Sequence, residues 1–312
     1  MSDRSVLVTG ASGCIGSVCA RQLVAAGYDV HGTSRSDAHP AIAGVTWHKT
    51  DLIAPGATAE LVAEVAPTHL LHMAWHMAAG NWQASGGDEH LAWVRASTEL
   101  VQAFHHQAND RGLRVVCAGS GTEYDWNLDT YPESASRKPA SFYGQAKTST
   151  GDLLMGYAEL EELSLAWGRI FFMYGGPENP RRLVPSVITN LLQGQEAPTS
   201  NGTQIRDFLY VEDIASAYVA LLGSDMTGAV NVASGDGVTL RSIIETIGEL
   251  TGATDLLRIG AIDQAPGDTP KVVADVTRLR SIGWTPAFDL EAGLAATIDY
   301  WQRRIDAGET SE

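Results

Sequence analysis

The stretch "LVTGASGCIGS", residues 7–17, sets three glycines between a short apolar run and a segment with helical spacing. Gly10 suits a tight turn, Gly13 lets the backbone approach a bound pyrophosphate, and Gly16 lets the following helix pack closely on the strand. The start of that helix offers free N–H groups and the positive end of its dipole. A turn that merely needs glycines is the plainer interpretation, but the strand–glycine–helix context favours a dinucleotide site. We expect cofactor contacts from Gly10, Ser12, Gly13, Cys14, Ile15 and Gly16.

Around this loop, short apolar runs alternate with longer helical stretches. The pattern predicts strands at 5–10, 28–34, 69–75, 114–120 and 163–175, and helices at 14–27, 59–67, 90–110 and 143–160. Repeated strand–helix units predict an α/β fold whose parallel sheet is covered by helices on both faces. After residue 175 the segment "GGPENPRRLVP" is rich in glycine and proline and is typical of a crossing between two lobes.

The chain of 312 residues exceeds the size, roughly 250–300 residues, at which one core stops growing. We therefore expect a Rossmann domain with a doubly wound parallel sheet in 1–175 plus about 204–235. A smaller C-terminal α/β lobe for substrate is expected in about 176–203 plus 236–312. Amphipathic helices at 239–252 and 289–304 would belong to that lobe.

Charge and composition exclude several classes of partner. The net charge of −16 argues against nucleic acid and anionic membranes, because phosphate binding needs clustered Lys and Arg. No secretory signal and no run of about 20 apolar residues is visible. Cys14, Cys19 and Cys117 form neither a CxxC pair nor an even framework, which favours free thiols in a reducing cytoplasm.

The choice of dinucleotide depends on the end of the second strand, "HGTSRSD". An acid there commonly binds the ribose 2′-hydroxyl, whereas this chain has Ser34 and Arg35, with Asp37 as the nearest acid. A guanidinium can pair with a 2′-phosphate, so we predict NADP over NAD, with NAD still possible. A solvated surface arginine is the alternative. Asp51 and Leu52 are expected at the adenine.

Tyr143 and Lys147 in "SFYGQAK" are spaced i,i+4 at the start of a helix, which puts both on one face. A nearby ammonium favours the phenolate and lowers the pKa of a tyrosine, which lets it exchange protons with a carbonyl or an alcohol. Upstream, the predicted strand in "RVVCAGSGTEYDW" ends at Ser120. A loop that leaves the core is one interpretation of that end; an active-site floor with Ser120 aimed at substrate is the other.

With these motifs the chain resembles the extended short-chain dehydrogenase/reductase family, in its NAD(P)-dependent sugar epimerase/dehydratase branch. The resemblance covers almost the whole chain, from the glycine loop through "HMAW", where HxAA is usual, to "GRIFFMYGGP", "RDFLYVEDIA" and "SIGWTPAFDLEAGL". It implies hydride transfer at the nicotinamide, with Tyr143 as acid/base, Lys147 on the nicotinamide ribose and Ser120 on the reacting sugar oxygen. It also implies a homodimer formed by the helices at about 90–108 and 143–160. Further cofactor contacts are expected from Met73, Ala74 and Trp75.

Departures from the family pattern narrow the expected activity. Sugar 4,6-dehydratases of this family follow the catalytic hydroxyl with an Asp-Glu pair, whereas Gly121 and Thr122 follow Ser120 here. Glu123 is one place too far along, and its side chain is expected to point away. The pattern looks more like reductases of 4-keto-6-deoxy nucleotide sugars. An NADPH-dependent ketoreductase is therefore our leading hypothesis, ahead of an NAD-dependent nucleotide-sugar 4-epimerase and a non-catalytic dinucleotide sensor.

The residues that would hold the nucleotide sugar also depart from the family pattern. Arg206 matches the family's diphosphate-binding arginine, but Ala265-Pro266 stand where many members have an arginine before Gly-Asp. Substrate contacts are expected from Ser120, Gly121, Thr122, Arg182, Val184 and Arg206. We expect no metal: His72 and His76 have the spacing of a helical zinc pair, but they lie at a strand end and lack the intervening glutamate of a metalloprotease.

Overall fold

The computed structural model describes residues 4–76, 87–107, 113–263 and 267–309. Its largest element is a parallel sheet of seven strands in the order β12-β7-β5-β4-β1-β2-β3. The strands are β1 (Ser5–Thr9), β2 (Asp29–Ser34), β3 (Val45–Lys49), β4 (His69–His72), β5 (Arg114–Ser120), β7 (Ser164–Ile170) and β12 (Gly228–Val232). The strand order reverses at β1, between β4 and β2, which is where open α/β sheets bind their ligands. The doubly wound Rossmann-type sheet expected from the sequence is confirmed.

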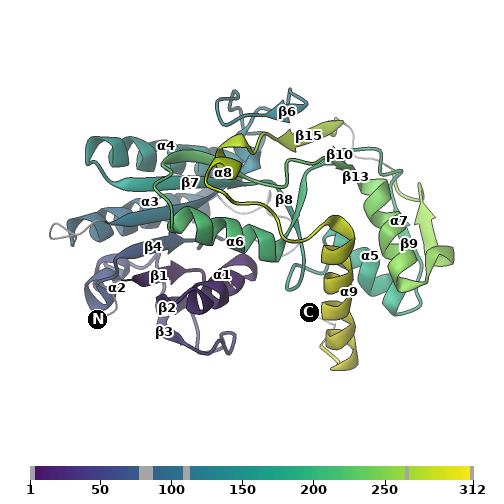
Figure 1. Ribbon diagram of the computed structural model, residues 1–312, viewed down its shortest axis with the longest axis horizontal. Coiled ribbons are helices and arrows are strands. Elements are labelled where there is room, and N and C mark those ends of the chain that lie inside the picture. Colours follow the sequence, from purple (N-terminus) through teal and green to yellow (C-terminus); the bar gives the residue numbers. More distant parts are fainter. Residues whose placement is uncertain (1–3, 77–86, 108–112, 264–266, 310–312) are drawn as a thin grey trace.

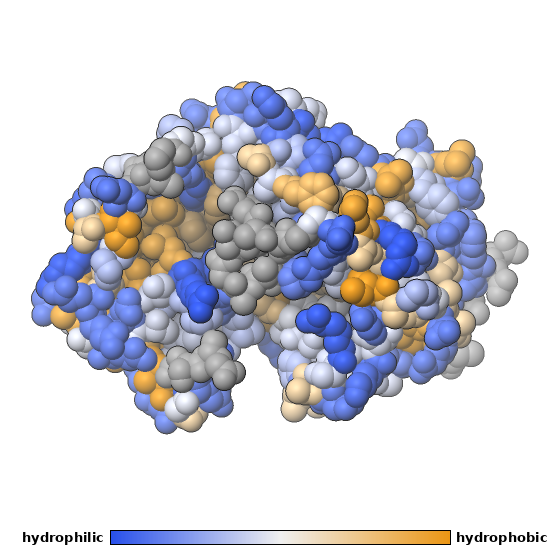
Figure 2. All heavy atoms as spheres, turned by 180° about the vertical axis from the view of Figure 1, so that it is seen from behind, coloured by the Kyte–Doolittle hydropathy of each residue, from blue (hydrophilic) through white to orange (hydrophobic). Residues whose placement is uncertain are grey.

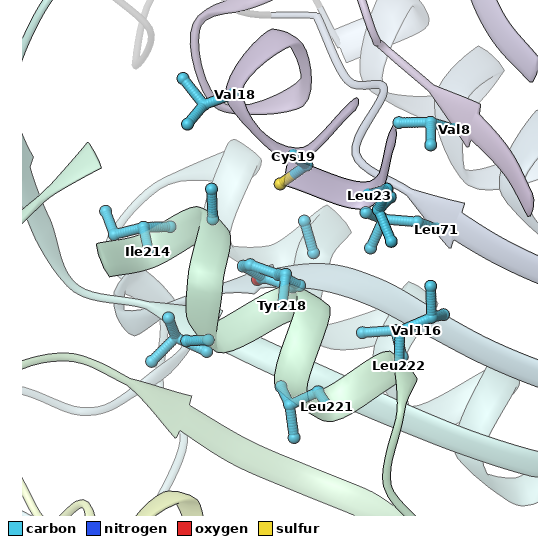
Figure 3. Packing of buried hydrophobic residues seen from close by; sticks show 14 of the residues in the cluster. Val8, Val18, Cys19, Leu23, Leu71, Val116, Ile214, Tyr218, Leu221 and Leu222 are labelled. Atoms are coloured by element: carbon cyan, nitrogen blue, oxygen red, sulfur yellow. The ribbon is translucent and has the colours of Figure 1, made fainter. Parts of the chain in front are cut away.

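Helices cover both faces of this sheet (Figure 1). The helices α1 (Cys14–Ala25) and α6 (Val211–Leu222) lie on one face, and α2 (Ala57–Val65), α3 (Gly87–His106) and α4 (Phe142–Leu160) lie on the other. Each face of the sheet has its own apolar core, and the alternating side chains of β1 contribute to both. Val6 and Val8 pack toward α1 and α6, while Leu7 packs toward α2 and α3. Figure 3 shows the first of these cores, where Tyr218 of α6 lies among Leu23 and Val116.

A third apolar cluster lies at the other end of the molecule. It is built by α5 (Leu183–Leu192), α7 (Leu240–Thr251) and α9 (Leu290–Asp306), which pack on one another. The remaining elements are β6 (Thr130–Tyr131), β8 (Phe172–Tyr174), β9 (Ala197–Thr199), β10 (Ile205–Arg206), β11 (Phe208–Tyr210), β13 (Val238–Thr239), β14 (Leu257–Ile259), β15 (Lys271–Ala274) and α8 (Thr277–Ser281). The strands among them form a four-stranded sheet in the order β13-β10-β15-β6 and two two-stranded sheets, β11-β8 and β14-β9. The domain boundaries given above stay a prediction.

The surface of the molecule also shows two separate ends. Figure 2, which views the molecule from behind, shows a notch between the end that holds the seven-stranded sheet and the end that holds α5, α7 and α9. Within the part of the chain that the structure describes, no helix is both long and apolar enough to cross a bilayer.

Two differences from the sequence-based expectation concern the large sheet. The strand β3 was not expected, because none of its residues is fully buried and it lies at the edge of the sheet. The run 163–175 was expected as one strand, but it divides into β7 and β8 at Phe171. The backbone N–H of Phe171 still donates to Val232 of β12, whereas β8 leaves the main sheet and pairs with β11. This break carries the chain from the large sheet toward the C-terminal elements.

Candidate active site

The glycine loop joins β1 to α1 at the reversal point of the sheet. Gly10 has φ +68°, and a Cβ there would lie 2.8 Å from the backbone nitrogen of Ala74. A Cβ on Gly16 would lie 2.1 Å from the carbonyl oxygen of Gly10, so the close approach of α1 to the loop requires glycine at position 16, while the positive φ and the contact with Ala74 require it at position 10. Gly13 is the N-cap of α1 and supplies no side-chain acceptor for the first N–H groups. Those donors are left for an anion, and the loop fits a dinucleotide pyrophosphate.

Three further cofactor candidates lie in or beside this loop, namely Cys14, Met73 and Ala74. Burial raises the pKa of Cys14 to about 12, which makes it a small packing residue rather than a reactive thiol. The backbone N–H of Met73 donates to the carbonyl of Thr9 at 3.2 Å, and the N–H of Ala74 donates to the Thr9 hydroxyl at 3.2 Å. The backbone after β4 is thus fixed against the loop at Gly10.

The end of β2 presents a hydroxyl and a guanidinium. Ser34 is buried, while Arg35 is exposed and forms no ion pair with the described residues. The nearest acid, Asp37, accepts a hydrogen bond from Lys49 at 2.8 Å, and this bond lowers its pKa. Asp37 is therefore occupied by another cation. Leu52 is buried in the core beneath α2 and α3.

Ser120, Tyr143 and Lys147 come together where β5 ends and α4 begins. All three are buried, with Ser120 at 8%, Tyr143 at 8% and Lys147 at 4% exposure. The helix starts in place because the Ser141 hydroxyl accepts from the N–H of Gly144 at 3.1 Å. Burial raises the pKa of Tyr143 to about 12, and a hydrogen bond with the Ser120 side chain opposes that rise. Tyr143 is therefore held as the neutral phenol.

Lys147 is held by two groups other than Tyr143. Its ammonium donates to the carbonyl of Ala118 at 2.8 Å and lies 4.0 Å from the centre of the Trp75 ring. Burial lowers the pKa of Lys147 to about 7, and Glu123 acts in the opposite direction. From the sequence, an ammonium was expected to lower the pKa of Tyr143; in this arrangement burial has the larger effect on that phenol.

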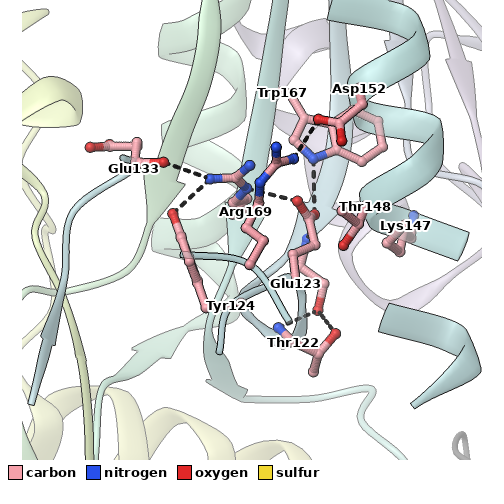
Figure 4. A network of polar contacts seen from close by, with 12 residues as sticks. Thr122, Glu123, Tyr124, Glu133, Lys147, Thr148, Asp152, Trp167 and Arg169 are labelled. Atoms are coloured by element: carbon pink, nitrogen blue, oxygen red, sulfur yellow. Dashed lines mark hydrogen bonds and ion pairs between the residues drawn. The ribbon is translucent and has the colours of Figure 1, made fainter. Parts of the chain in front are cut away.

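The turn that follows Ser120 is anchored by Glu123 (Figure 4). One carboxylate oxygen of Glu123 accepts from the backbone N–H of Ser120 at 2.8 Å and from the indole of Trp167 at 2.9 Å. The other accepts from Arg169 at 2.7 Å, and the Glu123 side chain has no exposed surface. Every strong interaction of this carboxylate is thus directed into the protein. Glu123 therefore anchors the turn and lies away from the substrate side, as its position in the sequence suggested.

Thr122 is the hydroxyl neighbour of Ser120 in this turn. The two hydroxyl oxygens lie 2.8 Å apart, and the N–H of Thr122 also donates to the Ser120 hydroxyl at 3.2 Å. Gly121 begins the 3-10 turn Gly121–Glu123, whose N-cap is Ser120. The Ser120 hydroxyl therefore has fixed partners on two sides, Thr122 and Tyr143.

On the C-terminal side a pocket of about 370 Å³ lies between α5, β9 and the segment after β14. It is lined by Arg181, Leu183, Ser186, Val187, Pro198, Thr199, Ser200, Gln204, Ile262, Asp263 and Asp268. The Thr199 hydroxyl and the Gln204 carbonyl oxygen are buried without a hydrogen-bond partner among the described residues. Buried polar atoms without partners are rare, so these two residues make the pocket a candidate ligand site.

Arg206 binds a residue of the pocket wall and is 4% exposed. It donates to Asp268 at 2.6 Å, and Asp268 also accepts from Gln204 at 2.9 Å. Of the other substrate candidates, Arg182 is the N-cap residue of α5, while Val184 is buried in the cluster of α5, α7 and α9. Ala265 and Pro266 lie outside the described residues.

Two acids of this region were not found from the sequence. Asp207 accepts from the N–H groups of Ser234, Gly235 and Ala274 at 2.8–3.1 Å, which fixes the turn that carries Arg206. Glu178 is 9% exposed, one of its oxygens has no partner among the described residues, and burial raises its pKa to about 8. An acid next to Arg206, at the start of the apolar run "FLYV", was the available signal for Asp207.

His72, the last residue of β4, and His76 both have structural partners. His72 is buried between the hydroxyls of Thr9 at 2.7 Å and Ser97 at 2.9 Å, and burial lowers its pKa to about 3. His76 pairs with Glu89 at 2.9 Å. Among the described residues, no group of three or more His, Cys, Asp or Glu side chains is arranged to hold a metal ion.

Comparison with known proteins places this site in a family. A UDP-glucose 4-epimerase of Azospirillum brasilense is 27% identical over 330 residues, which cover 96% of this chain and 92% of the relative. A dTDP-glucose 4,6-dehydratase of Escherichia coli is 25% identical over 244 residues, covering 70% and 67%. The structure of a UDP-N-acetylglucosamine 4-epimerase of Methanobrevibacter ruminantium M1 has the same fold, with a TM-score of 0.85 at 24% identity and coverage of 97% and 100%. The model of the "NAD dependent epimerase/dehydratase family" matches residues 6–233, and the chain therefore belongs to that family, as an enzyme of the extended short-chain dehydrogenase/reductase type.

Proposed function

We propose that this enzyme reduces the keto group of a nucleotide-linked 4-keto-6-deoxyhexose with NADPH. The observation that carries the proposal is the turn after β5. Ser120 and Tyr143 form a hydroxyl pair for a carbonyl oxygen, but the next positions are Gly121 and Thr122 rather than acids. The nearest acid, Glu123, is engaged by the Ser120 backbone, Trp167 and Arg169. The site thus has a proton donor and no free carboxylate in this turn for removing water.

Tyr143 is in the protonated form that reduction requires. Reduction of a ketone needs a proton on the oxygen as hydride reaches the carbon, and a phenol with a pKa near 12 is held in the donating form. NADPH supplies the hydride when bound. The Ser120 hydroxyl donates to the same oxygen and orients it toward Tyr143, while Lys147 holds the nicotinamide ribose.

Arg35 supports a preference for NADPH. Its guanidinium is exposed beside Ser34 and forms no ion pair with the described residues, while Asp37 is paired with Lys49. A 2′-phosphate can therefore reach an uncompensated cation, and charge-assisted hydrogen bonds to phosphate are about twice as strong as neutral ones.

The pocket beside Arg206 supports a nucleotide as the carrier of the sugar. Apolar walls from Leu183, Val187 and Ile262 suit a flat base, and the free polar atoms of Thr199 and Gln204 suit its edge. Arg206, which pairs with Asp268, carries the charge that a bound diphosphate would take over from that carboxylate. The direct test is NADPH oxidation with 4-keto-6-deoxy sugars on dTDP, CDP, GDP and UDP; turnover with at least one of them is expected.

A nucleotide-sugar 4-epimerase is the second candidate, because the Azospirillum brasilense relative that spans 96% of this chain is a UDP-glucose 4-epimerase. An epimerase recycles its dinucleotide. Its signature is cofactor that survives purification and interconversion of a nucleotide-linked hexose at C4 without net NADPH consumption, which an assay with UDP-glucose as substrate detects.

We also propose a homodimer through α3 and α4. Four apolar side chains on these helices are exposed: Leu91 at 57%, Phe142 at 45%, Leu153 at 57% and Leu160 at 78%. Large apolar side chains left on neighbouring helices are typical of a surface that another molecule covers. A second copy of the chain would bring two such surfaces together.

A further inference from the structure

The ring of Trp75 covers the ammonium of Lys147. Trp75 lies just beyond β4, and Lys147 lies in the second turn of α4, on the same side of the sheet. The Lys147 nitrogen is 4.0 Å from the centre of the Trp75 ring and 5.8 Å from that of Trp167. Its one hydrogen bond to a described residue goes to the carbonyl of Ala118. An aromatic face is therefore the second partner of this cation.

Trp75 is itself held by its neighbours. Its indole N–H donates to the Nδ1 atom of His90 at 3.2 Å, and His90 is 1% exposed. On one side the ring stacks near Trp93, with centroids 6.2 Å apart, and its edge meets the ring of Tyr143 at 6.5 Å. These contacts fix the ring in the plane that it presents to Lys147.

A lysine side chain is a flexible four-carbon stem with three N–H donors, and a single carbonyl does not define where its charge lies. A tryptophan face attracts a cation more strongly than the other aromatic rings do, most of all where water is excluded. Lys147 is only 4% exposed, so the Trp75 ring acts on it at close to full strength. In the HxAA pattern an alanine stands at the position of Trp75, and its methyl group offers no aromatic face to the lysine.

We propose that Trp75 is a positioning residue that fixes the Lys147 ammonium beside Tyr143, and that His90 fixes the Trp75 ring. The role of Lys147 in holding the cofactor rests on the function proposed above; the contact between Trp75 and Lys147 does not. Removal of the ring leaves Lys147 free to change rotamer, which weakens its hold on the nicotinamide ribose.

The contact can be measured without substrate or cofactor. The chain has four lysines, Lys49, Lys138, Lys147 and Lys271, so a protein labelled with ¹³C at lysine Cε gives few signals, and Lys147→Arg assigns the one of interest. Protons above an indole ring are shifted upfield by the ring current. We expect the Lys147 Hε signal upfield of the other three in the wild type. In Trp75→Met, which fills most of the space without a ring, the signal should return to their position.

Matched variants separate positioning from packing. Trp93→Phe alters the stack behind Trp75 and should leave the Lys147 signal upfield, whereas His90→Asn should move it part of the way back. In titrations followed by dinucleotide fluorescence, Trp75→Met should bind NADPH and NADH about 3- to 10-fold more weakly, and Trp75→Phe should lose less because it keeps a ring face.

Two results would overturn the proposal: a Lys147 signal that is not upfield in the wild type, or dinucleotide binding in Trp75→Met equal to that of the wild type. His90→Asn keeps the NMR test open if Trp75→Met does not fold, because an unchanged Lys147 signal there contradicts the role given to His90. Failure of the ketoreductase proposal looks different. It gives no turnover with any keto-sugar while the ring-current shift and the binding difference persist.

Discussion

The carboxylate of Glu123 accepts the backbone N–H of Ser120 at 2.8 Å while its other oxygen binds Arg169 at 2.7 Å. The position of the reacting hydroxyl is therefore tied to a buried ion pair. Arg169 also donates to the Tyr124 hydroxyl at 2.9 Å and to the carbonyl of Glu133 at 3.1 Å, so the network spans the end of the sheet (Figure 4).

Glu123→Gln should lower both stability and turnover. The variant leaves the Arg169 guanidinium buried without its anion, and breaking a buried pair from one side costs about 3–5 kcal/mol. Urea unfolding measures the loss. Asp152→Asn, which breaks the exposed pair with Arg137, is the control and should cost at most about 1 kcal/mol. Equal effects of the two substitutions would contradict a structural role for Glu123.

Tyr143→Phe should reduce kcat by about 10²- to 10⁴-fold, because it removes the proton donor and leaves the ring in place. NADPH binding, followed by fluorescence, should stay near the wild-type value. Tyr157→Phe removes a hydroxyl from the same helix, α4, and should leave kcat unchanged. A near-wild-type kcat in Tyr143→Phe removes this residue from the mechanism.

Arg35→Ala should lower kcat/KM for NADPH by about 10- to 100-fold, the value of one charge-assisted hydrogen bond to phosphate. The value for NADH should change little, since NADH has no 2′-phosphate. Arg95→Ala, another exposed arginine, serves as the control. If both dinucleotides lose equally, Arg35 does not select between them.

Glu178 should make stability depend on pH. Its pKa rises from 4.5 to about 8 on folding, so the folded protein keeps this proton through a range in which the unfolded chain has lost it. The contribution of Glu178 to stability therefore falls as pH rises from about 4.5 to about 8. Glu178→Gln should unfold at a higher urea concentration than the wild type at pH 8, and this advantage should shrink at pH 5. The exposed Glu159→Gln should show no such change; an advantage of Glu178→Gln that is the same at both pH values contradicts the shift.

Leu153→Glu combined with Leu160→Glu should convert a dimer to a monomer in sedimentation experiments. The two leucines are seven residues apart on α4 and share one exposed face. Leu250→Glu places the same charge on an exposed leucine of α7 and should leave the association state unchanged. A wild-type monomer at micromolar concentration would contradict the proposed dimer.

Local patterns in the sequence were sufficient for much of this structure. The glycine loop and the buried strands are short-range features, and so is the spacing of Tyr143 and Lys147. The role of Glu123 was not predictable, because its partners Trp167 and Arg169 lie more than 40 residues away on β7. For the same reason the sequence could not show that Trp75 meets Lys147, which comes from a different strand–helix unit. The free polar atoms of Thr199 and Gln204 likewise appear only when α5, β9 and the segment after β14 enclose a pocket.

The most direct test of the central claim is the stoichiometry of cofactor use with a 4-keto-6-deoxy nucleotide sugar and NADPH deuterated at C4 on the transferred face. Ketoreduction predicts one NADPH consumed per product molecule and one deuterium at C4 of the product sugar. No reduction of any 4-keto-6-deoxy sugar, together with interconversion of a nucleotide-linked hexose at C4 that consumes no NADPH, would contradict the account and identify an epimerase.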